Sequence, residues 1–401
     1  MKSVRTIDIL IFAIGLLLPL INLTGNVDTA IEANNIFSRI AIVDILVIFF
    51  LINSFIARQI NISFAGKFYI YVLIFSCCLG LFFTASDPGL SSYTGVLAEF
   101  AALFMAFLYW ILGYTIAKDL HSLKVLIAGI FASVYWQAII VIHDFLFPTQ
   151  QWFQSRLIGR VTGTFRNGAQ LSVYGYMVTG IVFTFGNILV KKRWLLIVIT
   201  GLLSSLFVIG GSRRTAIFAI SVAMAIYLFL GLMKNDKRAY GIVVFLVTLG
   251  VGIVLGNGEN LNEFFVVERI DNAFEIASDP DNFIFEQYES VFNNIGQWFP
   301  WGVGIGRNYL ISPTGKHEMH SAYTSILVDL GVPGFVAFFW LFFDVFRQRR
   351  SNSNILITAA YYIVIAFLFS TFVMMIHGTL HRDRYFMLYL GLVSRVYLVK
   401  S

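Results

Sequence analysis

The chain has 401 residues, of which 58% are hydrophobic and only 12% are charged. Soluble domains carry charge on about a quarter of their residues, so this composition excludes a soluble enzyme and indicates an integral membrane protein. The two cysteines, Cys77 and Cys78, are adjacent within one apolar run, where a structural disulfide is implausible.

Apolar runs of near-spanning length recur along the chain and predict transmembrane helices, not the alternating pattern of a β-barrel. The first run follows a charged start and lacks a small-residue cleavage site, so it is predicted to be an uncleaved span. The predicted spans are residues 7–24, 40–57, 68–84, 93–117, 125–147, 171–190, 194–210, 215–232, 239–255, 322–346, 355–376 and 385–399. The expected fold is an all-α integral membrane protein, a single domain over 1–401 with about 12 transmembrane helices.

The distribution of lysine and arginine orients these spans. Seventeen of the 28 cations fall in the termini and in the connections on one side, which the positive-inside rule assigns to the cytoplasm. Ten of the remaining eleven are arginine. Arginine anchors helices at lipid headgroups, but its planar, permanently charged fork also binds phosphate or carboxylate. The excess of arginine over lysine among the outer cations therefore favours an anion site on the outer side.

The longest outer connection, residues 256–321, is predicted to be a partly helical loop on the outer side. Residues 264–276 and 283–295 each space apolar side chains at helical intervals, which is typical of amphipathic helices lying on a membrane. QWFPW at 297–301 has the composition of an interfacial aromatic belt. GVGIG at 302–306 is expected to be a flexible turn, because no strand and helix frame it as a nucleotide-binding fingerprint.

Ionisable residues collect in the outer halves of the predicted spans. Asp44, Glu99 and Asp329 lie within apolar runs, where a carboxylate is costly and is usually functional. The alternative role for Asp44 and Glu99 is to pair structurally with a nearby arginine. Five of the six histidines are also placed at or near the outer side: His143, His317, His320, His377 and His381.

Two stretches bring outer arginines together. In GGSRRTAIF (210–218), Arg213 and Arg214 begin a predicted helix, whose dipole and free N–H groups favour an anion. Two cations there are unfavourable for the helix alone, so a bound anion would relieve the conflict, although interface anchoring is the alternative. In RLIGRVTGTFRNGAQLSVYGY (156–176), three arginines, Arg156, Arg160 and Arg166, are spaced by glycine and small polar residues that suit an extended polyanion.

These stretches resemble the O-antigen ligase and O-antigen polymerase superfamily of bacterial envelope enzymes. The similar features are RVTGTFRNGAQ, GSRRTA after a span, ERI around Arg269, PWGVGIGRNYL, and HSAYTSILVDLGVPG, in that order over about residues 156–345. The chain departs from the family pattern at Ser321, where asparagine commonly follows the histidine, and in its doubled arginines.

The resemblance implies glycan transfer from undecaprenyl diphosphate to an acceptor hydroxyl, such as that of the lipid A core, at the periplasmic face of the inner membrane. Nucleic acid, cofactor and metal are not expected to take part. The implied functional positions are His320, Arg269 and either Arg213 or Arg214, with Arg160 and Arg166 as further diphosphate ligands. His320 would act as the general base because imidazole titrates near neutral pH. His317, Glu99, Asp44 and Arg307 are expected to support the site.

Three alternatives remain open at this point. A polymerase would join the glycan to another lipid-linked repeat, and the sequence favours the ligase only slightly. A lipid-linked sugar flippase would place ionisable groups at the membrane midplane and show an internal repeat. A metalloenzyme would use His317, His320, His377 and His381, whose spacings put each pair on one helical face.

Overall fold

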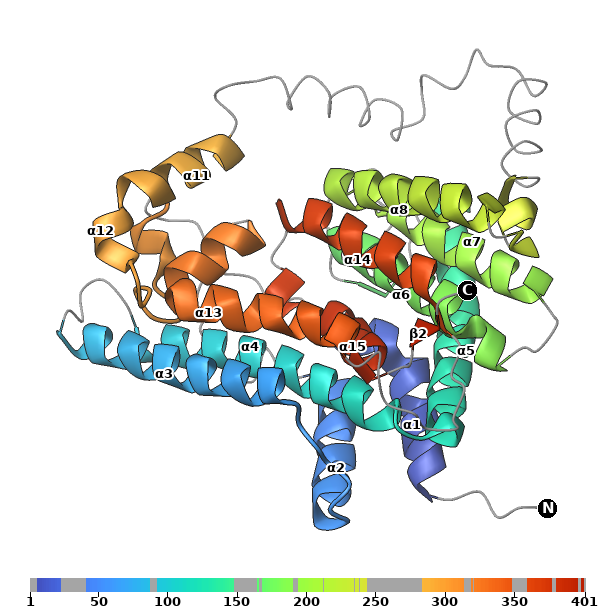
Figure 1. Cartoon of the computed structure of the whole chain (residues 1–401), viewed down its shortest axis with the longest axis horizontal. Helices are drawn as coiled ribbons and strands as arrows, with labels where there is room; N and C mark the ends of the chain where they lie inside the picture. Colours follow the sequence, from blue (N-terminus) through green and yellow to red (C-terminus); the bar gives the residue numbers. More distant parts are fainter. Residues whose placement is uncertain are drawn as a thin grey trace.

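The computed structural model is a bundle of helices (Figure 1). It describes residues 6–22, 41–86, 92–147, 164–165, 168–189, 194–211, 213–233, 235–237, 239–243, 283–313, 319, 321–347, 359–376, 380–395 and 398–399. Within these ranges the strands are two residues long each, β1 (Ala359–Ala360) and β2 (Leu398–Val399), and they pair in parallel. The expected all-helical class is confirmed for the described part of the chain.

The helices follow the predicted spans closely. They are α1 (Thr6–Leu17), η1 (Leu18–Asn22), α2 (Ile42–Ile56), α3 (Phe64–Ser86), α4 (Tyr93–Ile116), α5 (Leu120–Leu146), α6 (Gly168–Leu189), α7 (Trp194–Gly210), α8 (Arg214–Met233), α11 (Phe283–Asn293), α12 (Ile295–Trp298), η4 (Asn308–Leu310), α13 (Ala322–Arg347), α14 (Tyr361–Ile376), η6 (Leu380–Arg382) and α15 (Arg384–Arg395). Every predicted span except 239–255, which falls mostly outside the described residues, coincides with one of them.

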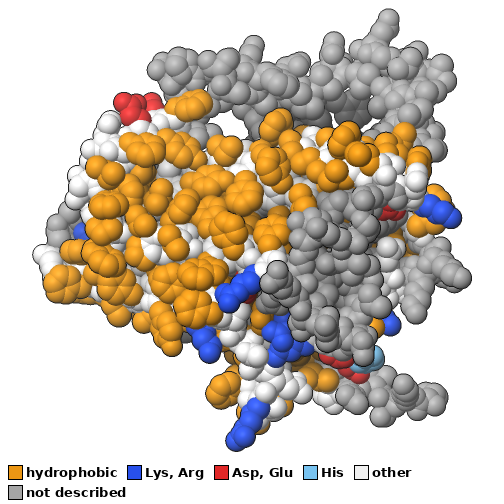
Figure 2. Space-filling view, viewed as in Figure 1, with side chains coloured by type: hydrophobic (Ala, Val, Ile, Leu, Met, Phe, Trp, Pro, Cys, Tyr) orange, Lys and Arg blue, Asp and Glu red, His pale blue; other side chains and the backbone are white. Residues whose placement is uncertain are grey.

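Length and composition show which of these helices suit a membrane. Within the described part, 6 helices are long and apolar enough to cross it, namely α3, α4, α5, α6, α8 and α13. Shorter apolar helices are α1, α2, α7 and α14. Large apolar side chains such as Phe55, Phe82 and Phe343 are exposed, and Figure 2 shows apolar side chains gathered over much of the left and central part of the face in view. A surface this apolar needs lipid around it, while the total of about 12 spans stays a prediction.

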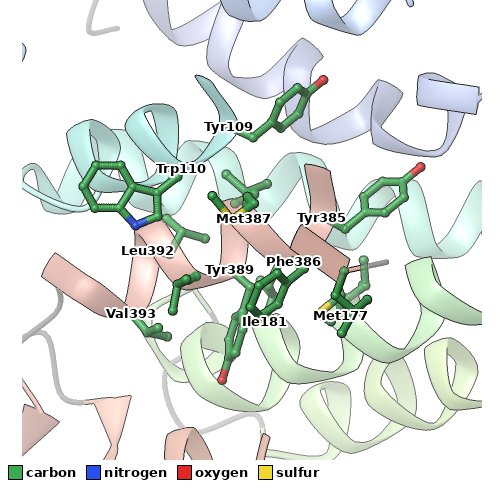
Figure 3. Close-up of a cluster of buried hydrophobic side chains, with 14 of the residues drawn as sticks. Tyr109, Trp110, Met177, Ile181, Tyr385, Phe386, Met387, Tyr389, Leu392 and Val393 are labelled. Carbon is green, nitrogen blue, oxygen red and sulfur yellow. The ribbon is translucent and has the colours of Figure 1, made fainter. Parts of the chain in front are cut away.

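The centre of the bundle forms where α15 crosses α4 and α6. Figure 3 shows Trp110 of α4 and Leu392 of α15 in this contact, with Ile181 of α6 beneath them. The backbones of α15 and α4 are in contact here: a Cβ at Gly391 would lie only 2.2 Å from the carbonyl oxygen of Trp110. This close approach sets the position of α15 against α4.

α13 is broken after its first part. Gly331 has φ 68° and ψ −168°, a conformation that essentially glycine alone adopts, and Pro333 follows. The loop 299–306 fills the break: Val303 N–H donates to the carbonyl of Val328 (2.7 Å), and Val332 N–H donates to the carbonyl of Pro300 (2.8 Å). The backbone groups that leave the helical ladder therefore find partners in this loop.

The expected flexible turn at 302–306 is instead a packed strap. Its three glycines, Gly302, Gly304 and Gly306, all have positive φ. Ile305 is fully buried, and its N–H donates to the carbonyl of Ser76 in α3 (3.1 Å). The glycines are needed for close contact with neighbouring backbone, so their number reflects tight packing and not freedom of movement. We call residues 300–306 the glycine strap.

The second predicted amphipathic helix of the outer loop coincides with α11, which lies beside the start of α13 with α12 (Figure 1). Phe285 and Phe292 on α11 are exposed, whereas Gln287 and Val291 are buried. The first predicted helix, residues 264–276, lies outside the described residues.

The contact between the strap and the break sets the first prediction. Gly331→Ala should lower the free energy of unfolding by roughly 2–5 kcal/mol, from backbone strain at positive φ and from overlap with the strap. The added Cβ would lie 2.3 Å from the carbonyl oxygen of Pro300. Thermal unfolding in detergent measures the loss. Gly296→Ala is the matched control, because a Cβ there has nothing within 4 Å; equal unfolding midpoints for the two variants would contradict the strap's role.

Candidate functional site

The sequence His381-Arg382-Asp383-Arg384, at the join of η6 and α15, is the centre of the candidate site. Each of its charged residues interacts with a charge near the start of another helix. α2, α4, α8, α13 and α15 thus bring their N-terminal ends together, and helix N-termini carry partial positive charge. We call the charged residues that meet here the arginine–acid network.

Arg382 joins α4 to α13. Its Nη1 lies 2.8 Å from Oε1 of Glu99, and its Nη2 lies 3.4 Å from Oδ2 of Asp329. Glu99 is 5% exposed and Asp329 is 1% exposed. Removing one partner from a pair this buried would leave an uncompensated charge at a cost of about 3–5 kcal/mol.

Polar side chains from α13 and from the end of the strap complete this half of the network. Asn308 donates its Nδ2 to Oδ2 of Asp329 (2.9 Å), and Ser325 donates its hydroxyl to the same oxygen (3.2 Å). Arg382 Nη2 also donates to Ser325 Oγ (3.1 Å). The strap therefore delivers Asn308 directly to the carboxylate that lies just before the helix break.

His381 is buried beside Arg382. Its Nε2 accepts a hydrogen bond from Arg382 Nε (3.3 Å), which assigns the ring proton to Nδ1. Burial, with the neighbouring Arg382 charge, holds the pKa of His381 well below its usual value. The ring is therefore neutral and orients the guanidinium.

The metalloenzyme alternative gains no support from this histidine. Nε2 of His381 is already engaged with Arg382, and His317, His320 and His377 lie outside the described residues. Within the described ranges, no group of three His, Cys, Asp or Glu side chains is placed to hold a metal ion.

Arg384 joins α15 to α2. Its Nη2 lies 2.9 Å from Oδ2 of Asp44, which is fully buried. Tyr109 of α4 donates its hydroxyl to Oδ1 of Asp44 (3.0 Å), and the N–H of Ala41 donates to Oδ2 (2.8 Å). Asp44 therefore caps the start of α2 while it pairs with the arginine.

Asp383 connects α15 to α8. Its Oδ1 accepts the N–H of Phe386 (2.8 Å), so it caps α15, and it interacts electrostatically with Arg213 and Arg384. Burial raises the pKa of Asp383 to about 6, although the Phe386 N–H and the two arginines oppose this shift. Burial lowers the pKa of Arg213, and Asp383 opposes that change. The N–H of Arg213 donates to Ser172 Oγ of α6 (3.2 Å), which fixes the start of α8.

The arginines of the network are already opposed by acids. Arg213, Arg382 and Arg384 face Asp44, Glu99, Asp329 and Asp383. This supports the structural alternative for Asp44 and Glu99, since both pair with an arginine. The network holds its guanidinium groups rigidly, and additional cations are required if a diphosphate is to be neutralised there.

The other residues predicted for the site are placed as follows. Arg214 begins α8, with its side chain outside the described part, and Arg307 is buried next to the strap, one residue from Asn308. Those outside the described residues are Arg160, Arg166, Arg269, His317 and His320.

The residues on both sides of position 320 are buried and anchored. Met319 is fully buried in a cluster with Trp298 and Val328. Ser321 Oγ lies 2.8 Å from the hydroxyl of Tyr288 on α11 and donates to the carbonyl of Met375 on α14 (3.3 Å). Burial raises the pKa of Tyr288, so this hydroxyl stays protonated. The chain at the start of α13 is thus held by α11, α12 and α14.

Sequence reasoning gave no site role to Arg382, Arg384, Asp383, Asn308 or Tyr288. The alternation of charge in His-Arg-Asp-Arg directly before an apolar run was a usable signal for Asp383. Asn308 and Tyr288 had no such signal, because their partners are distant in the chain.

Comparison with known proteins agrees with the resemblance found in the sequence. Residues 199–339 match the family model Wzy_C, described as O-Antigen ligase. The match begins in α7 and ends in α13, so it includes Arg213, Tyr288, the glycine strap and Asp329. No curated protein matches the chain. The family match supports the predicted place of the chain in the O-antigen ligase superfamily.

The raised pKa of Asp383 gives a pH-dependent prediction. A carboxyl with a raised folded-state pKa takes up its proton first in the folded state, so its contribution stabilises the fold at low pH and is lost as pH rises through about 6. Asp383→Asn should remove this dependence. The difference in unfolding midpoint between parent and variant should therefore change between pH 4 and pH 7, and a constant difference would show that Asp383 ionises normally.

Proposed function

We propose, from the O-antigen ligase match of residues 199–339, that this chain is a membrane glycosyltransferase. It would move a glycan from undecaprenyl diphosphate to an acceptor hydroxyl of the lipid A core. The reaction would occur at the periplasmic face of the bacterial inner membrane, with both termini in the cytoplasm. The observation that carries the proposal is the convergence of Arg213, Arg382 and Arg384 at helix N-termini next to the chain that leads into α13.

The reaction needs little beyond charge stabilisation and one proton transfer. The acceptor oxygen forms a bond to the anomeric carbon while the bond from that carbon to the diphosphate oxygen breaks. The hydroxyl proton passes to His320, and undecaprenyl diphosphate leaves as the anion. Because the attack is opposite the leaving group, the anomeric configuration is inverted. Arginines that face the diphosphate stabilise the charge that develops on it, and stabilisation of this kind usually contributes most to the rate in such catalysis.

The arginine–acid network supports this role as a frame. Donors that are fixed before the substrate arrives need no reorganisation during the reaction. Arg213 lies directly before α8, where the free N–H groups and the dipole of the helix add partial positive charge for a substrate anion. We assign the diphosphate to Arg213 together with Arg214 and Arg269, with Arg160 and Arg166 from the other arginine-rich segment.

The anchored neighbours of residue 320 support His320 as the base. Its two neighbours in the chain, Met319 and Ser321, are both buried. A general base must stay within hydrogen-bond reach of the proton it accepts. Ser321, where the family pattern has asparagine, is anchored through its contact with Tyr288.

A flippase is less well supported than a transferase. The buried ionisable side chains of the network lie within about two turns of the starts of α2, α4, α13 and α15. A transporter of lipid-linked sugars needs its binding groups near the membrane midplane.

The product of a reconstituted reaction separates the ligase from the polymerase: lipid-linked glycan is supplied with lipid A core or with a second lipid-linked repeat. Glycosylated core identifies a ligase, and lengthened lipid-linked chains identify a polymerase.

Replacing the proposed base should stop transfer while leaving the donor bound. His320→Ala is expected to lower turnover by about 10²–10⁴-fold, the usual contribution of general base catalysis. Turnover is measured in proteoliposomes with lipid-linked glycan and acceptor, and donor binding is measured separately. A variant that still turns over at the parent rate removes His320 from the mechanism.

Replacing arginine with lysine should identify the residue that binds the diphosphate. Lysine keeps the charge but loses the planar fork, so the change is damaging only where the fork grips the diphosphate. Arg213→Lys, Arg214→Lys and Arg269→Lys are compared for donor binding and turnover, each with membrane insertion verified. We expect at least a tenfold loss in donor affinity at a contacting position and little change at a neighbouring one. Parent-like binding in all three variants would make these arginines anchors only.

A further inference from the structure

Arg307 is a buried cation that is not part of the arginine–acid network. Its side chain is only 7% exposed, and its Nε and Nη1 donate no hydrogen bond within the described residues. Its guanidinium lies over the ring of Phe83 of α3, 5.4 Å from the ring centroid. No ion pair between Arg307 and an acid is found in the part of the chain that the structure describes.

The burial of Arg307 beside an aromatic ring favours a bound anion. A buried charge without a hydrogen-bonded partner costs several kcal/mol. A cation–π contact offsets about 0.5–2 kcal/mol of that cost. Because the ring contact alone leaves a deficit, a ligand with negative charge would stabilise the side chain where it is.

The backbone around Arg307 is fixed on both sides. Gly306 packs on the first turn of α4, where a Cβ would lie 3.0 Å from Cα of Val96. Asn308 is held by its bond to Asp329 (2.9 Å), and the carbonyl of Arg307 accepts the N–H of Leu310 (3.1 Å). The glycine strap thus presents Arg307 beside the N-terminal end of α4, which itself favours an anion.

The surface next to Arg307 is apolar and exposed. Phe82 and Tyr93, at the facing ends of α3 and α4, are 65% and 48% exposed. Trp301 of the strap is also exposed and contacts Phe75 of α3, with 5.9 Å between their ring centroids. These side chains continue the apolar surface of α3, which length and composition make a candidate membrane span (Figure 2). A ligand reaching Arg307 along this surface would carry a hydrocarbon tail.

We propose that Arg307 binds the phosphate headgroup of a lipid whose tail lies along the outer part of α3 and the start of α4. The site is next to the arginine–acid network and is connected to it through Asn308, but the arginines assigned to the donor diphosphate do not form it. Two lipids share the required chemistry, a phospholipid of the bilayer and a polyprenyl diphosphate. The polyprenyl diphosphate as ligand rests on the proposed function, whereas the lipid phosphate site at Arg307 does not.

The test counts and compares bound anionic lipids in the full-length protein by native mass spectrometry from detergent. The probes are phosphatidylglycerol, geranylgeranyl diphosphate and inorganic pyrophosphate. Arg307→Gln is expected to lose one bound lipid and at least tenfold in affinity, because it loses a charge-assisted contact. The matched control is Arg347→Gln, at the other end of α13, where the arginine is exposed; its lipid binding should equal that of the parent.

The remaining outcomes are equally decisive. If Arg307→Gln does not fold, Arg307→Lys replaces it, and weaker lipid binding is expected because the fork is lost. Lipid binding equal to the parent in whichever variant folds would overturn the proposal, as would inorganic pyrophosphate binding as tightly as the lipids. Preference for phosphatidylglycerol identifies a bilayer lipid, and preference for the diphosphate identifies a substrate-class lipid. If reconstituted protein transfers no glycan but Arg307-dependent lipid binding persists, the proposed function fails and this site stands.

Discussion

The ion pair of Arg382 with Glu99 and Asp329 is the constraint on which the site depends. It is made inside the bundle, where a single guanidinium lies against two carboxylates from different helices. An isolated buried charge is so costly that the three side chains hold α4, α13 and the start of α15 in one arrangement. Arg384 and Asp44 extend the same constraint to α2, and Asp383 extends it to α8. Mutual charge pairing thus specifies which helix starts meet.

Backbone packing makes these pairs geometrically possible. The contact between Gly391 and the backbone of Trp110 brings α15 close against α4, the helix that carries Glu99. The break at Gly331 lets the glycine strap enter α13, and the strap carries Asn308 to Asp329. A continuous α13 would leave no place for Val303 to donate to Val328. The break in α13 is consequently what allows the buried carboxylate of Asp329 to receive its hydrogen bond from Asn308.

The sequence predicted helix positions well because apolar periodicity and length are local properties. Span 194–210 coincides with α7, and span 322–346 differs from α13 by one residue. The sequence also placed Asp44, Glu99 and Asp329 on one side, and the structure joins all three to arginines. Their specific partners were not predictable, since Arg384 pairs with a residue hundreds of positions away. The prediction of a flexible turn at 302–306 was wrong for a related reason. Glycine permits both flexibility and close packing, and only the tertiary contacts distinguish the two.

The pairing of the network also constrains how an anionic substrate can enter it. Arg382 and Arg384 face carboxylates at 2.8 and 2.9 Å, so a diphosphate that approached them would compete with fixed buried charges. Arg213 faces an acid whose pKa of about 6 lies close to neutral pH. A second anion near Arg213 would raise this pKa further, because like charges disfavour ionisation. Asp383 would then take up a proton as the anion arrives, and the net repulsion would fall. We therefore propose the start of α8 as the point at which the network admits negative charge, while the pairs around Arg382 and Arg384 hold the frame in place.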